Sequence, residues 1–247
     1  MKQILILSAF PDEQKHYMAT LTVKEKKQLG FVDVTICEHE GVFIYLATTG
    51  MGTVNAALVL ATLAARMRFD AVFFSGTSGG IDASLKIGDV VVATDAFDAD
   101  IFSIHEAVVG TPFEAALVNP NKKEKTPRFF EAHPKLLEHA KTDKWAFGVF
   151  KGRIATSNHF PSPAELFAEI KAKNSMVIDM ESVALYQFSW ASNLPCLVVR
   201  GVSNVLDHKG VDEDVAQSDV SSSDHAAMLV LDCINALVLL HQQALKI

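Results

Sequence analysis

The chain has 247 residues, 49% of them hydrophobic, a formal net charge of −7 and a pI of about 5.7. These totals allow a large apolar core, and because α/β units of this length commonly form one domain, we expect a single domain over residues 1–247. The 22 lysines and arginines form no basic stripe, which argues against a nucleic-acid partner. The three cysteines form no CxxC pair, which favours core packing in a reducing compartment over a disulfide framework.

The apolar run at residues 3–9 is too short for a spanning helix and passes directly into charged residues. It therefore predicts a buried first strand. The other strongly apolar segments, residues 56–66 and 226–240, are shorter than a membrane span requires and carry or meet a charge. We expect a cytoplasmic protein without a membrane partner.

Short β-branched runs alternate with helical patterns along the chain. The runs predict strands over residues 3–9, 31–37, 42–48, 71–76, 89–95, 152–157 and 195–202. The helical patterns cover residues 53–67, 162–173, 181–192 and 222–245. Ser162, Pro163 and Glu165 form a capping box that predicts the start of the second helix. This alternation predicts a mostly parallel sheet with helices on both faces.

Residues 103–135 fit this alternation poorly. They contain four prolines and the charged run NKKEKTPR, so we expect a long excursion over the surface. Segments of this kind commonly serve as lids or partner contacts.

Polar loops follow several of the expected strands, where open α/β folds place their ligands. The segment SAFPDEQK, residues 8–15, sets Glu13 just after a proline turn. A carboxylate in a first helical turn is either a partner of the helix dipole or a general base at the mouth of the sheet. The sequence alone leaves both interpretations open.

Two glycine-rich loops follow other strands. TTGMGTVNAAL, residues 48–58, has a Gly-x-Gly before a helix, which suits a tight turn or the approach of backbone to a ligand, but it lacks a third glycine and a Walker lysine. FSGTSGGID, residues 74–82, places Thr77 and Ser78 among three glycines. Such a loop forms a pocket floor rich in backbone N–H groups and hydroxyls.

The segment VIDMESVAL, residues 177–185, places Asp179 and Glu181 where a strand meets a helix. Either residue can cap the helix, and the alternative is that Glu181 holds the two hydroxyls of a sugar diol. The nine histidines form no HExxH motif, and no G-x-S-x-G is present. We therefore expect neither a metal site nor a serine hydrolase triad.

Together these segments resemble the nucleoside phosphorylase/nucleosidase superfamily, most closely its methylthioadenosine/S-adenosylhomocysteine nucleosidases. The matching motifs are SAFPDE, TTGMGTVNAAL, FSGTSGGIDASLKIGDVVVATDAFDAD, GRIATSNHF, VIDMES and LPCLVVRGVSN. The likeness spans nearly the whole chain and weakens over residues 103–150. It implies a three-layer α/β/α fold around a twisted, mostly parallel mixed sheet. It also implies a purine nucleosidase that hydrolyses the N-glycosidic bond of a 5′-substituted nucleoside without a metal or other cofactor.

The resemblance assigns the central roles to two acidic residues. Glu13 would be the base that activates water, and Glu181, beside Met180, would hold the ribose hydroxyls. The transition state is a ribosyl oxocarbenium ion, so nearby carboxylates stabilise its developing positive charge.

The resemblance also implies a lining for the substrate. Phe160 would stack on the purine, and Phe10 and Met51 would pack near the sugar and its 5′ substituent. Thr77 and Ser78 would line the ribose and water side.

Phosphorolysis, the reaction of related enzymes, needs a phosphate site that is usually built with arginines. SAFPDEQKH offers only Lys15, and DAVFFSGTSGG offers no cation. Arg200 matches the family's arginine on the strand before the catalytic loop, but a single arginine is thin support for a phosphate pocket. Water is therefore the expected acceptor, with phosphorolysis as an alternative.

The segment VVRGVSNVLD carries Asn204 where adenine-specific nucleosidases of this family have an aspartic acid that protonates the purine. An amide can donate a hydrogen bond but cannot transfer a proton, and loss of general acid catalysis costs roughly 10²–10⁴ in rate. Pro161 lacks the N–H that the family offers to adenine. Both departures favour, as an alternative, a 6-oxopurine nucleoside such as inosine or futalosine.

The family completes its 5′ pocket with a loop from a neighbouring subunit, so we expect a homodimer. The candidate loop is HEAVVGTPFE, residues 105–114, in which Pro112 and Phe113 would contact the neighbouring subunit. In the alternative interpretation, these two residues pack on their own subunit. The loop continues to about residue 130 as a long segment with prolines and lysines, which leaves the identity of the 5′ substituent open. Asn204 also leaves open a non-catalytic nucleoside-binding or storage protein, although Glu13 and Glu181 favour a catalyst.

Overall fold

The computed structural model describes residues 2–101, 127–159, 162–206 and 221–244, with backbone only for 240–244. Its elements in chain order are β1 (Gln3–Ser8), the 3-10 turn η1 (Pro11–Gln14), α1 (Lys15–Thr20), β2 (Thr22–Leu29), β3 (Val32–His39), β4 (Val42–Thr48), α2 (Thr53–Ala64), β5 (Ala71–Gly80), β6 (Val90–Asp98), β7 (Phe130–Glu131), α4 (Pro134–His139), β8 (Val149–Thr156), α5 (Ala164–Ala172), β9 (Ser175–Asp179), α6 (Ser182–Ser192), β10 (Cys196–Val205) and α7 (Ser221–Ala244). Each of the seven predicted strands and four predicted helices is present, with ends shifted by a few residues.

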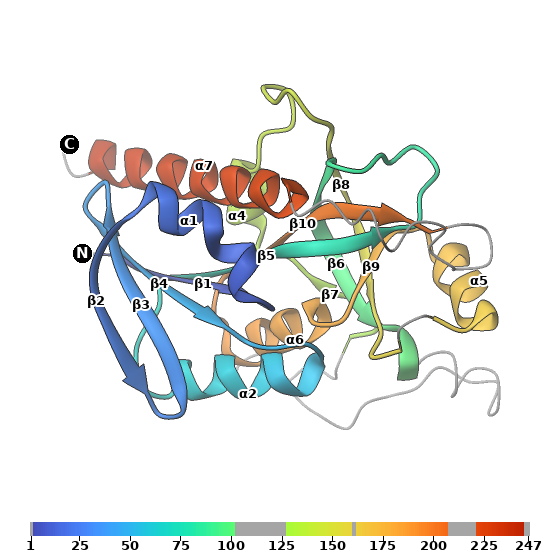
Figure 1. Cartoon of the computed structure of the whole chain (residues 1–247), viewed down its shortest axis with the longest axis horizontal. Coiled ribbons are helices and arrows are strands. Elements are labelled where there is room, and N and C mark those ends of the chain that lie inside the picture. Colours follow the sequence, from blue (N-terminus) through green and yellow to red (C-terminus); the bar gives the residue numbers. More distant parts are fainter. Residues whose placement is uncertain (1, 102–126, 160–161, 207–220, 245–247) are drawn as a thin grey trace.

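The helices cover both faces of one sheet, as expected for three layers (Figure 1). α1 and α7 lie on one face, and α2 and α6 lie on the other. The strands between them are almost wholly buried, because β1, β5 and β10 carry continuous apolar runs that both helical layers cover. The expectation of an α/β fold with a mixed sheet is confirmed.

The sheet has two parts that meet at β5. On one side, β1 pairs in parallel with β4 and β5, and β4, β3 and β2 continue as an antiparallel meander. On the other side, β5 pairs with β10, β10 with β6, β6 with β8, β8 with β9, and β9 with β5. These five strands form a closed ring, because β5 is long enough to pair with β1 near its start and with β9 at its end.

The longest pairings, β10–β5 and β6–β8, are parallel as expected, but half of the strand pairs in the described part of the chain are antiparallel. Among the described residues, β2–β3, β3–β4, β5–β9, β6–β7 and β6–β10 are antiparallel. Alternation of strands and helices predicts only the parallel crossovers, so the meander and the ring closure could not be seen from it.

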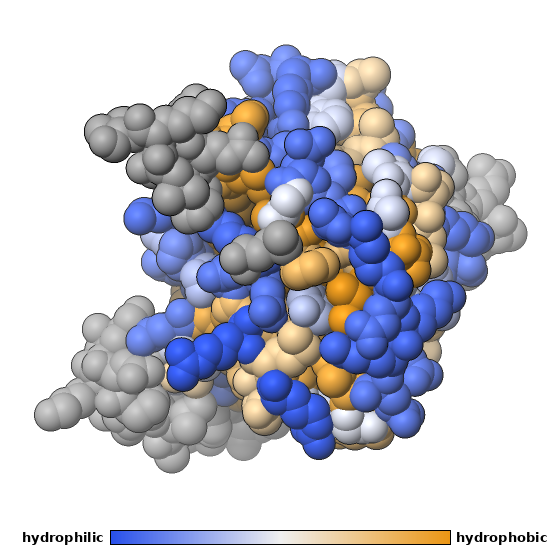
Figure 2. Space-filling model, turned by 90° about the vertical axis from the view of Figure 1, so that its left-hand side faces the viewer, coloured by the Kyte–Doolittle hydropathy of each residue, from blue (hydrophilic) through white to orange (hydrophobic). Residues whose placement is uncertain are grey.

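Strand β2 was absent from the predicted elements, because its sequence TVKEKKQL lacks an apolar face. It is an edge strand that pairs only with β3 in the described part of the chain. Charged side chains on an edge prevent pairing with other chains. Figure 2 views the side of the molecule on which β2 lies, and hydrophilic side chains cover much of it.

The predicted capping box of α5 is wrong. The helix begins at Ala164, and Pro163 is its N-cap with an extended ψ of 146°. The Ser162 hydroxyl donates instead to the carbonyl oxygen of His159 at 3.5 Å. The expected surface excursion also ends earlier than residue 135, because β7 pairs with β6 and Pro134 begins α4; residues 102–126 of it lie outside the described residues.

Helix α7 has the length and apolar composition of a membrane span over Ser221–Leu239, but 56% of that segment is buried inside the fold. Its residues Leu229, Cys233 and Ile234 are buried in the main core. The start of the helix packs so closely on β10 that a Cβ at Gly201 would lie 1.9 Å from the carbonyl oxygen of Ser222. Its apolar composition is therefore accounted for by packing against the sheet.

Candidate active site

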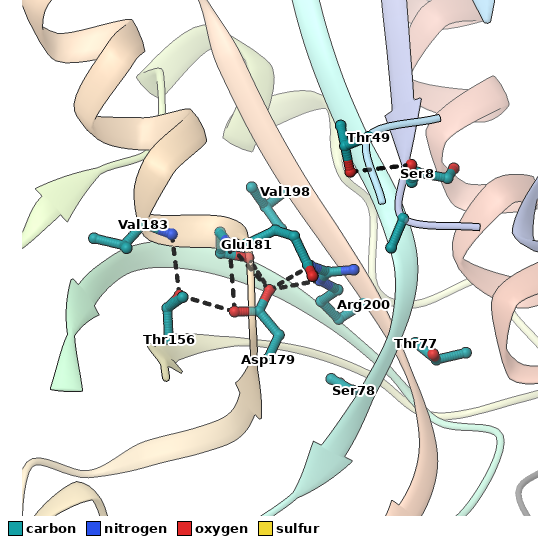
Figure 3. A network of polar contacts seen from close by, with 12 residues as sticks. Ser8, Thr49, Thr77, Ser78, Thr156, Asp179, Glu181, Val183, Val198 and Arg200 are labelled. Carbon is teal, nitrogen blue, oxygen red and sulfur yellow. Dashed lines mark hydrogen bonds and ion pairs between the residues drawn. The ribbon is translucent and has the colours of Figure 1, made fainter. Parts of the chain in front are cut away.

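The loops that carry the polar motifs meet at the carboxyl ends of the parallel strands. The N–H groups of Thr49 and Gly50 donate to the carbonyl oxygens of Ser8 and Ala9, at 2.9 and 3.0 Å, which joins the loop after β4 to the loop after β1. In Figure 3, Thr49 and Ser8 lie on one side of Arg200, and Asp179 and Glu181 lie on the other. The fold thus gathers segments that are far apart in the sequence.

Glu13 lies in η1, directly after β1, and is only 5% exposed. Its Oε2 accepts hydrogen bonds from the N–H groups of Ala9 (2.8 Å) and Phe10 (3.1 Å). Its Oε1 accepts from the N–H and the hydroxyl of Thr77, at 2.7 and 3.1 Å. Four donors from two loops thus fix the orientation of this carboxylate. The side chain faces the floor of the sheet, so it does more than complement a helix dipole.

Gly76 is required for this arrangement. A Cβ at that position would lie 2.5 Å from Oε1 of Glu13 and 2.7 Å from its carboxyl carbon. Any side chain at residue 76 would therefore displace the carboxylate. The glycine-rich loop after β5 thus provides room for Glu13 as well as the donors of Thr77.

Glu181 is 4% exposed and holds the N-cap position of α6, yet its side chain makes no capping bond. Its Oε1 accepts from the N–H of Gly52 at 2.9 Å, and its Oε2 accepts from Nη2 of Arg200 at 2.8 Å. Burial raises the pKa of Glu181, and the positive charge of Arg200 opposes that rise. The side chain is thus turned away from its helix toward the loop after β4.

Asp179 does the capping instead. Its carboxylate accepts from the N–H of Ser182 at 3.2 Å and from the Ser182 hydroxyl. The hydroxyl of Thr156 donates to Asp179 at 2.8 Å and accepts from the N–H of Val183 at 3.0 Å. These contacts satisfy the first free N–H groups of α6. Of the two capping alternatives left open by the sequence, the structure selects Asp179.

Arg200 is fully buried, and Figure 3 shows it next to Asp179 and Glu181. Its Nε donates to Asp179 at 2.8 Å, and its guanidinium carbon lies 4.3 Å from the centre of the Phe74 ring. Burial lowers the pKa of Arg200, but the negative charges of Asp179, Glu181 and Glu13 raise it by more. The net shift of the pKa is upward. Arg200 is therefore a buried cation held by carboxylates.

Glu13 and Glu181 lie near the same point of the fold. Residue 200 of β10 is registered opposite Gly76 of β5, where a Cβ would touch the Glu13 carboxylate. The same Arg200 contacts Glu181 through Nη2. Glu181 thus contacts Arg200 directly, and the charge of Glu13 acts on the same arginine.

Asn204 lies on β10 after a bulge that shifts the register with β5 between Val202 and Asn204. Its Oδ1 is 2.8 Å from the hydroxyl of Ser203, which also lies 3.3 Å from the carbonyl oxygen of Ser78. Ser78 is buried, and its own hydroxyl lies 3.4 Å from the carbonyl oxygen of Gly201. Thr77 thus contacts Glu13, and Ser78 contacts the strand that carries Asn204.

The apolar residues predicted to line the substrate are accessible. Phe10 and Met51 are 43% and 54% exposed, on loops that the Gly50–Ala9 hydrogen bond joins, and Met180 is half-buried. Phe160, Pro161, Pro112 and Phe113 lie outside the described residues.

A second polar network was not predicted. Asp100 accepts from the N–H of Asn158 at 2.8 Å and from the Ser157 hydroxyl at 2.5 Å. Asn158 Oδ1 accepts from the N–H of Thr53 at 3.1 Å, at the start of α2. This network ties the loop after β8 to the Gly52 region that contacts Glu181. The motifs GRIATSNHF and DAFDAD contain Asp100, Ser157 and Asn158. These residues meet only because β6 and β8 are neighbouring strands.

No group of three or more histidine, cysteine, aspartate or glutamate side chains in the described part of the chain is placed to hold a metal ion. A groove of about 490 Å³ lies beside η1, lined by Pro11, Gln14 and residues of β2, β3 and β4. Neither Glu13, Glu181 nor Arg200 lines it. Because the carboxylates and glycine-rich loops carry the chemistry, we place the candidate site with them and not in this groove.

Comparison with known proteins agrees with this geometry. Residues 3–235 match the sequence profile of the Phosphorylase superfamily. A 5′-methylthioadenosine/S-adenosylhomocysteine nucleosidase of Bacillus licheniformis is 28% identical over 239 residues, covering 94% of this chain and 98% of that protein. The structure of such a nucleosidase from Colwellia psychrerythraea, in complex with adenine, has a TM-score of 0.80 at 24% identity and covers 95% of each chain. The futalosine hydrolase of Helicobacter pylori has a TM-score of 0.78 at 20% identity, covering 95% of this chain and 98% of that one. Both structures share the fold.

Proposed function

This chain belongs to the Phosphorylase superfamily, and we propose on that basis that it is a purine nucleosidase of the 5′-methylthioadenosine/S-adenosylhomocysteine type. It hydrolyses the N-glycosidic bond of a 5′-substituted nucleoside and releases the free base and a ribose product. The observation that carries this proposal is the pair of buried carboxylates, Glu13 and Glu181, whose charges both act on Arg200.

Each carboxylate has a distinct task in this reaction. The bond between C1′ and the purine breaks with its electron pair passing to the base, and water forms the new bond at C1′. Glu13 takes the proton of that water. A water that donates to Oε1 replaces the Thr77 hydroxyl, since the other donors to Glu13 are fixed backbone N–H groups. Glu181 accepts from the ribose hydroxyls with its remaining lone pairs.

The charges of the site suit an oxocarbenium transition state. Asp179 and Glu181 contact the guanidinium of Arg200 and Glu13 acts on it through its charge, so three carboxyl groups share one cation in this buried group of described residues. A negative, desolvated environment stabilises the positive charge that develops on the sugar.

Water is favoured over phosphate as the acceptor. Arg200 is neutralised by Asp179 and Glu181, so its charge is not available to bind phosphate. Lys15 is exposed and pairs with Asp12 at 3.0 Å. A phosphate site needs cations whose charge is not already paired, and both of these residues are paired with carboxylates.

An assay of base release tests the proposal. The protein is incubated with methylthioadenosine, adenosylhomocysteine, inosine and futalosine, each with and without phosphate, and the free base is measured. We expect release from at least one 5′-substituted nucleoside at a rate independent of phosphate. Release that requires phosphate would contradict hydrolysis, and release from none would favour a nucleoside-binding or storage protein.

A second candidate, a 6-oxopurine nucleoside hydrolase, is supported by Asn204. The half-buried amide has no proton to transfer, so an adenine leaving group takes its proton from solvent. We expect Asn204→Asp to increase adenine release about tenfold or more if the base is adenine. If the natural base is a 6-oxopurine, the same variant loses activity on inosine or futalosine. Measuring both activities in both proteins separates the two candidates.

We also propose that the protein is a homodimer. Met51, Val54 and Leu58 are 54%, 70% and 53% exposed. Val54 and Leu58 are four residues apart on one face of α2, and Met51 lies in the loop just before the helix. A partner that covers this apolar strip reduces its contact with water. Sedimentation should show a dimer that Leu58→Asp weakens, while a monomeric wild type would contradict the proposal.

A further inference from the structure

Arg200 makes different contacts with its two acidic neighbours. Asp179 Oδ2 accepts from Nε at 2.8 Å and lies 2.5 Å from Nη2. From Arg200, Glu181 Oε2 accepts a hydrogen bond only from Nη2, at 2.8 Å. Asp179 therefore occupies the edge of the guanidinium formed by Nε and Nη2, and Glu181 receives a single contact.

Asp179 is itself fixed by its surroundings. Thr156 and the N–H and hydroxyl of Ser182 donate to its carboxylate. Its carbonyl oxygen accepts from the N–H of Ser157 at 2.9 Å. Four elements, β8, β9, α6 and β10, meet at this one side chain, so its position is set by the backbone of the ring.

We propose that Asp179 is a positioning residue for ribose recognition, acting through Arg200 to keep the Glu181 carboxylate open to the sugar hydroxyls. The inference rests on the proposed function, in which Glu181 holds the ribose. A guanidinium prefers to bind a carboxylate with two parallel N–H donors. Without Asp179, Arg200 directs two parallel N–H donors to Glu181, and these donors occupy both oxygens of the Glu181 carboxylate. Asp179 prevents this because it accepts from Nε and Nη2 itself.

The contact of Glu181 with Gly52 fits the same role. Gly52 N–H donates to Oε1 and Arg200 donates to Oε2, so each oxygen keeps a lone pair free for a hydroxyl. A carboxylate held at both oxygens by one donor each is well oriented for a vicinal diol. No other described side chain contacts both Arg200 and the start of α6 as Asp179 does.

The test compares Asp179→Asn with Thr156→Val as a matched control. Both variants remove hydrogen bonds near the start of α6, but only the first removes the negative charge that holds Arg200. The readout is the ratio of kcat/KM for a ribonucleoside substrate to kcat/KM for its 2′-deoxy analogue, together with the melting temperature. Because hydrogen bonds to charged groups are strong, we expect Asp179→Asn to lower this ratio about tenfold. Thr156→Val should keep the wild-type ratio while lowering the melting temperature.

An Asp179→Asn protein that is destabilised but keeps the wild-type ratio would overturn the inference and leave Asp179 a purely structural cap. If Asp179→Asn does not fold, Asp179→Glu replaces it. The longer carboxylate keeps the charge but displaces the guanidinium toward Glu181, so the ratio should again fall, and an unchanged ratio would overturn the inference. A wild type that releases no base from any nucleoside instead refutes the proposed function itself.

Discussion

Glu13 and Glu181 are both buried carboxylates at the same end of the sheet, yet they are stabilised differently. Glu13 accepts four hydrogen bonds from uncharged donors, three backbone N–H groups and one hydroxyl. Glu181 accepts one backbone N–H and an ion pair from Arg200. Dipoles solvate a charge and leave it in place, whereas a guanidinium neutralises it.

This difference matches the two proposed tasks. A base that takes a proton from water beside a forming cation benefits from a charge that its neighbours do not cancel. A carboxylate that holds two hydroxyls needs a fixed orientation, which Arg200 provides. Changes on the Glu13 side should therefore act on the chemical step, and changes on the Glu181 side should act on sugar recognition.

The largest effect is expected from Glu13→Gln. The amide keeps the shape of the side chain but cannot take a proton, so kcat should fall by about 10²–10⁴ while KM changes little. Its NH2 group also faces N–H donors, which costs about 1–3 kcal/mol of stability. Steady-state base release and thermal unfolding measure the two effects.

The matched control for this variant is Asp12→Asn, the same chemical change one residue away. Asp12 is exposed and paired only with Lys15 among its described neighbours. It should leave both kcat and stability nearly unchanged. A Glu13→Gln protein with wild-type kcat would remove the distinction between the two carboxylates.

A smaller loss is expected from Gly76→Ala. The new Cβ would lie 2.5 Å from Oε1 of Glu13, so the carboxylate must move. A displacement near 1 Å at a catalytic group costs about 10²-fold in rate. Gly79→Ala is the control, since its Cβ would meet Ile178 and Leu206 at an ordinary 3.4 Å. Equal kcat values for the two variants would show that the position of Glu13 does not limit the reaction.

The smallest effect is a pH dependence on the Glu181 side. Burial raises the pKa of Glu181 above its ordinary value of 4.5, and Arg200 only partly opposes this. Since the ionised form binds the hydroxyls, kcat/KM should fall as the pH drops through the raised pKa. The fall should occur at a higher pH than for an exposed glutamate.

Stability should change in the opposite direction over this interval. A carboxyl group whose pKa is raised by folding binds its proton more tightly in the folded state. Its contribution to the free energy of unfolding is therefore greatest below 4.5 and decreases as the pH rises through the raised pKa. Thermal unfolding of wild type and Glu181→Gln across this interval checks the sign. A fall in kcat/KM centred at or below pH 4.5 would contradict the assignment of ribose binding to ionised Glu181.

The sequence predicts the strands of the core well, because β1, β4, β5 and β10 are apolar runs whose burial dominates their local structure. It does not predict β2, whose charged side chains match no buried strand. It also cannot show that β5 and β9 close a ring, since pairing between distant segments leaves no local pattern.

The same limit applies to the site. Motif positions at strand ends identify Glu13, Thr77 and Glu181 as candidates. The role of Asp179 is not visible, because a capping aspartate and one that holds a buried arginine have the same local sequence. Only the register of β10 against β5 shows that residue 200 lies opposite Gly76, the glycine that makes room for the Glu13 carboxylate.

The most direct test of the division of work between Glu13 and Glu181 is a crystal structure of Glu13→Gln with an intact 5′-substituted ribonucleoside. Glu181 should accept hydrogen bonds from the 2′ and 3′ hydroxyls. Residue 13 should reach a water on the face of C1′ opposite the purine. A sugar whose hydroxyls point away from Glu181, or a residue 13 separated from C1′ by other protein groups, would contradict it.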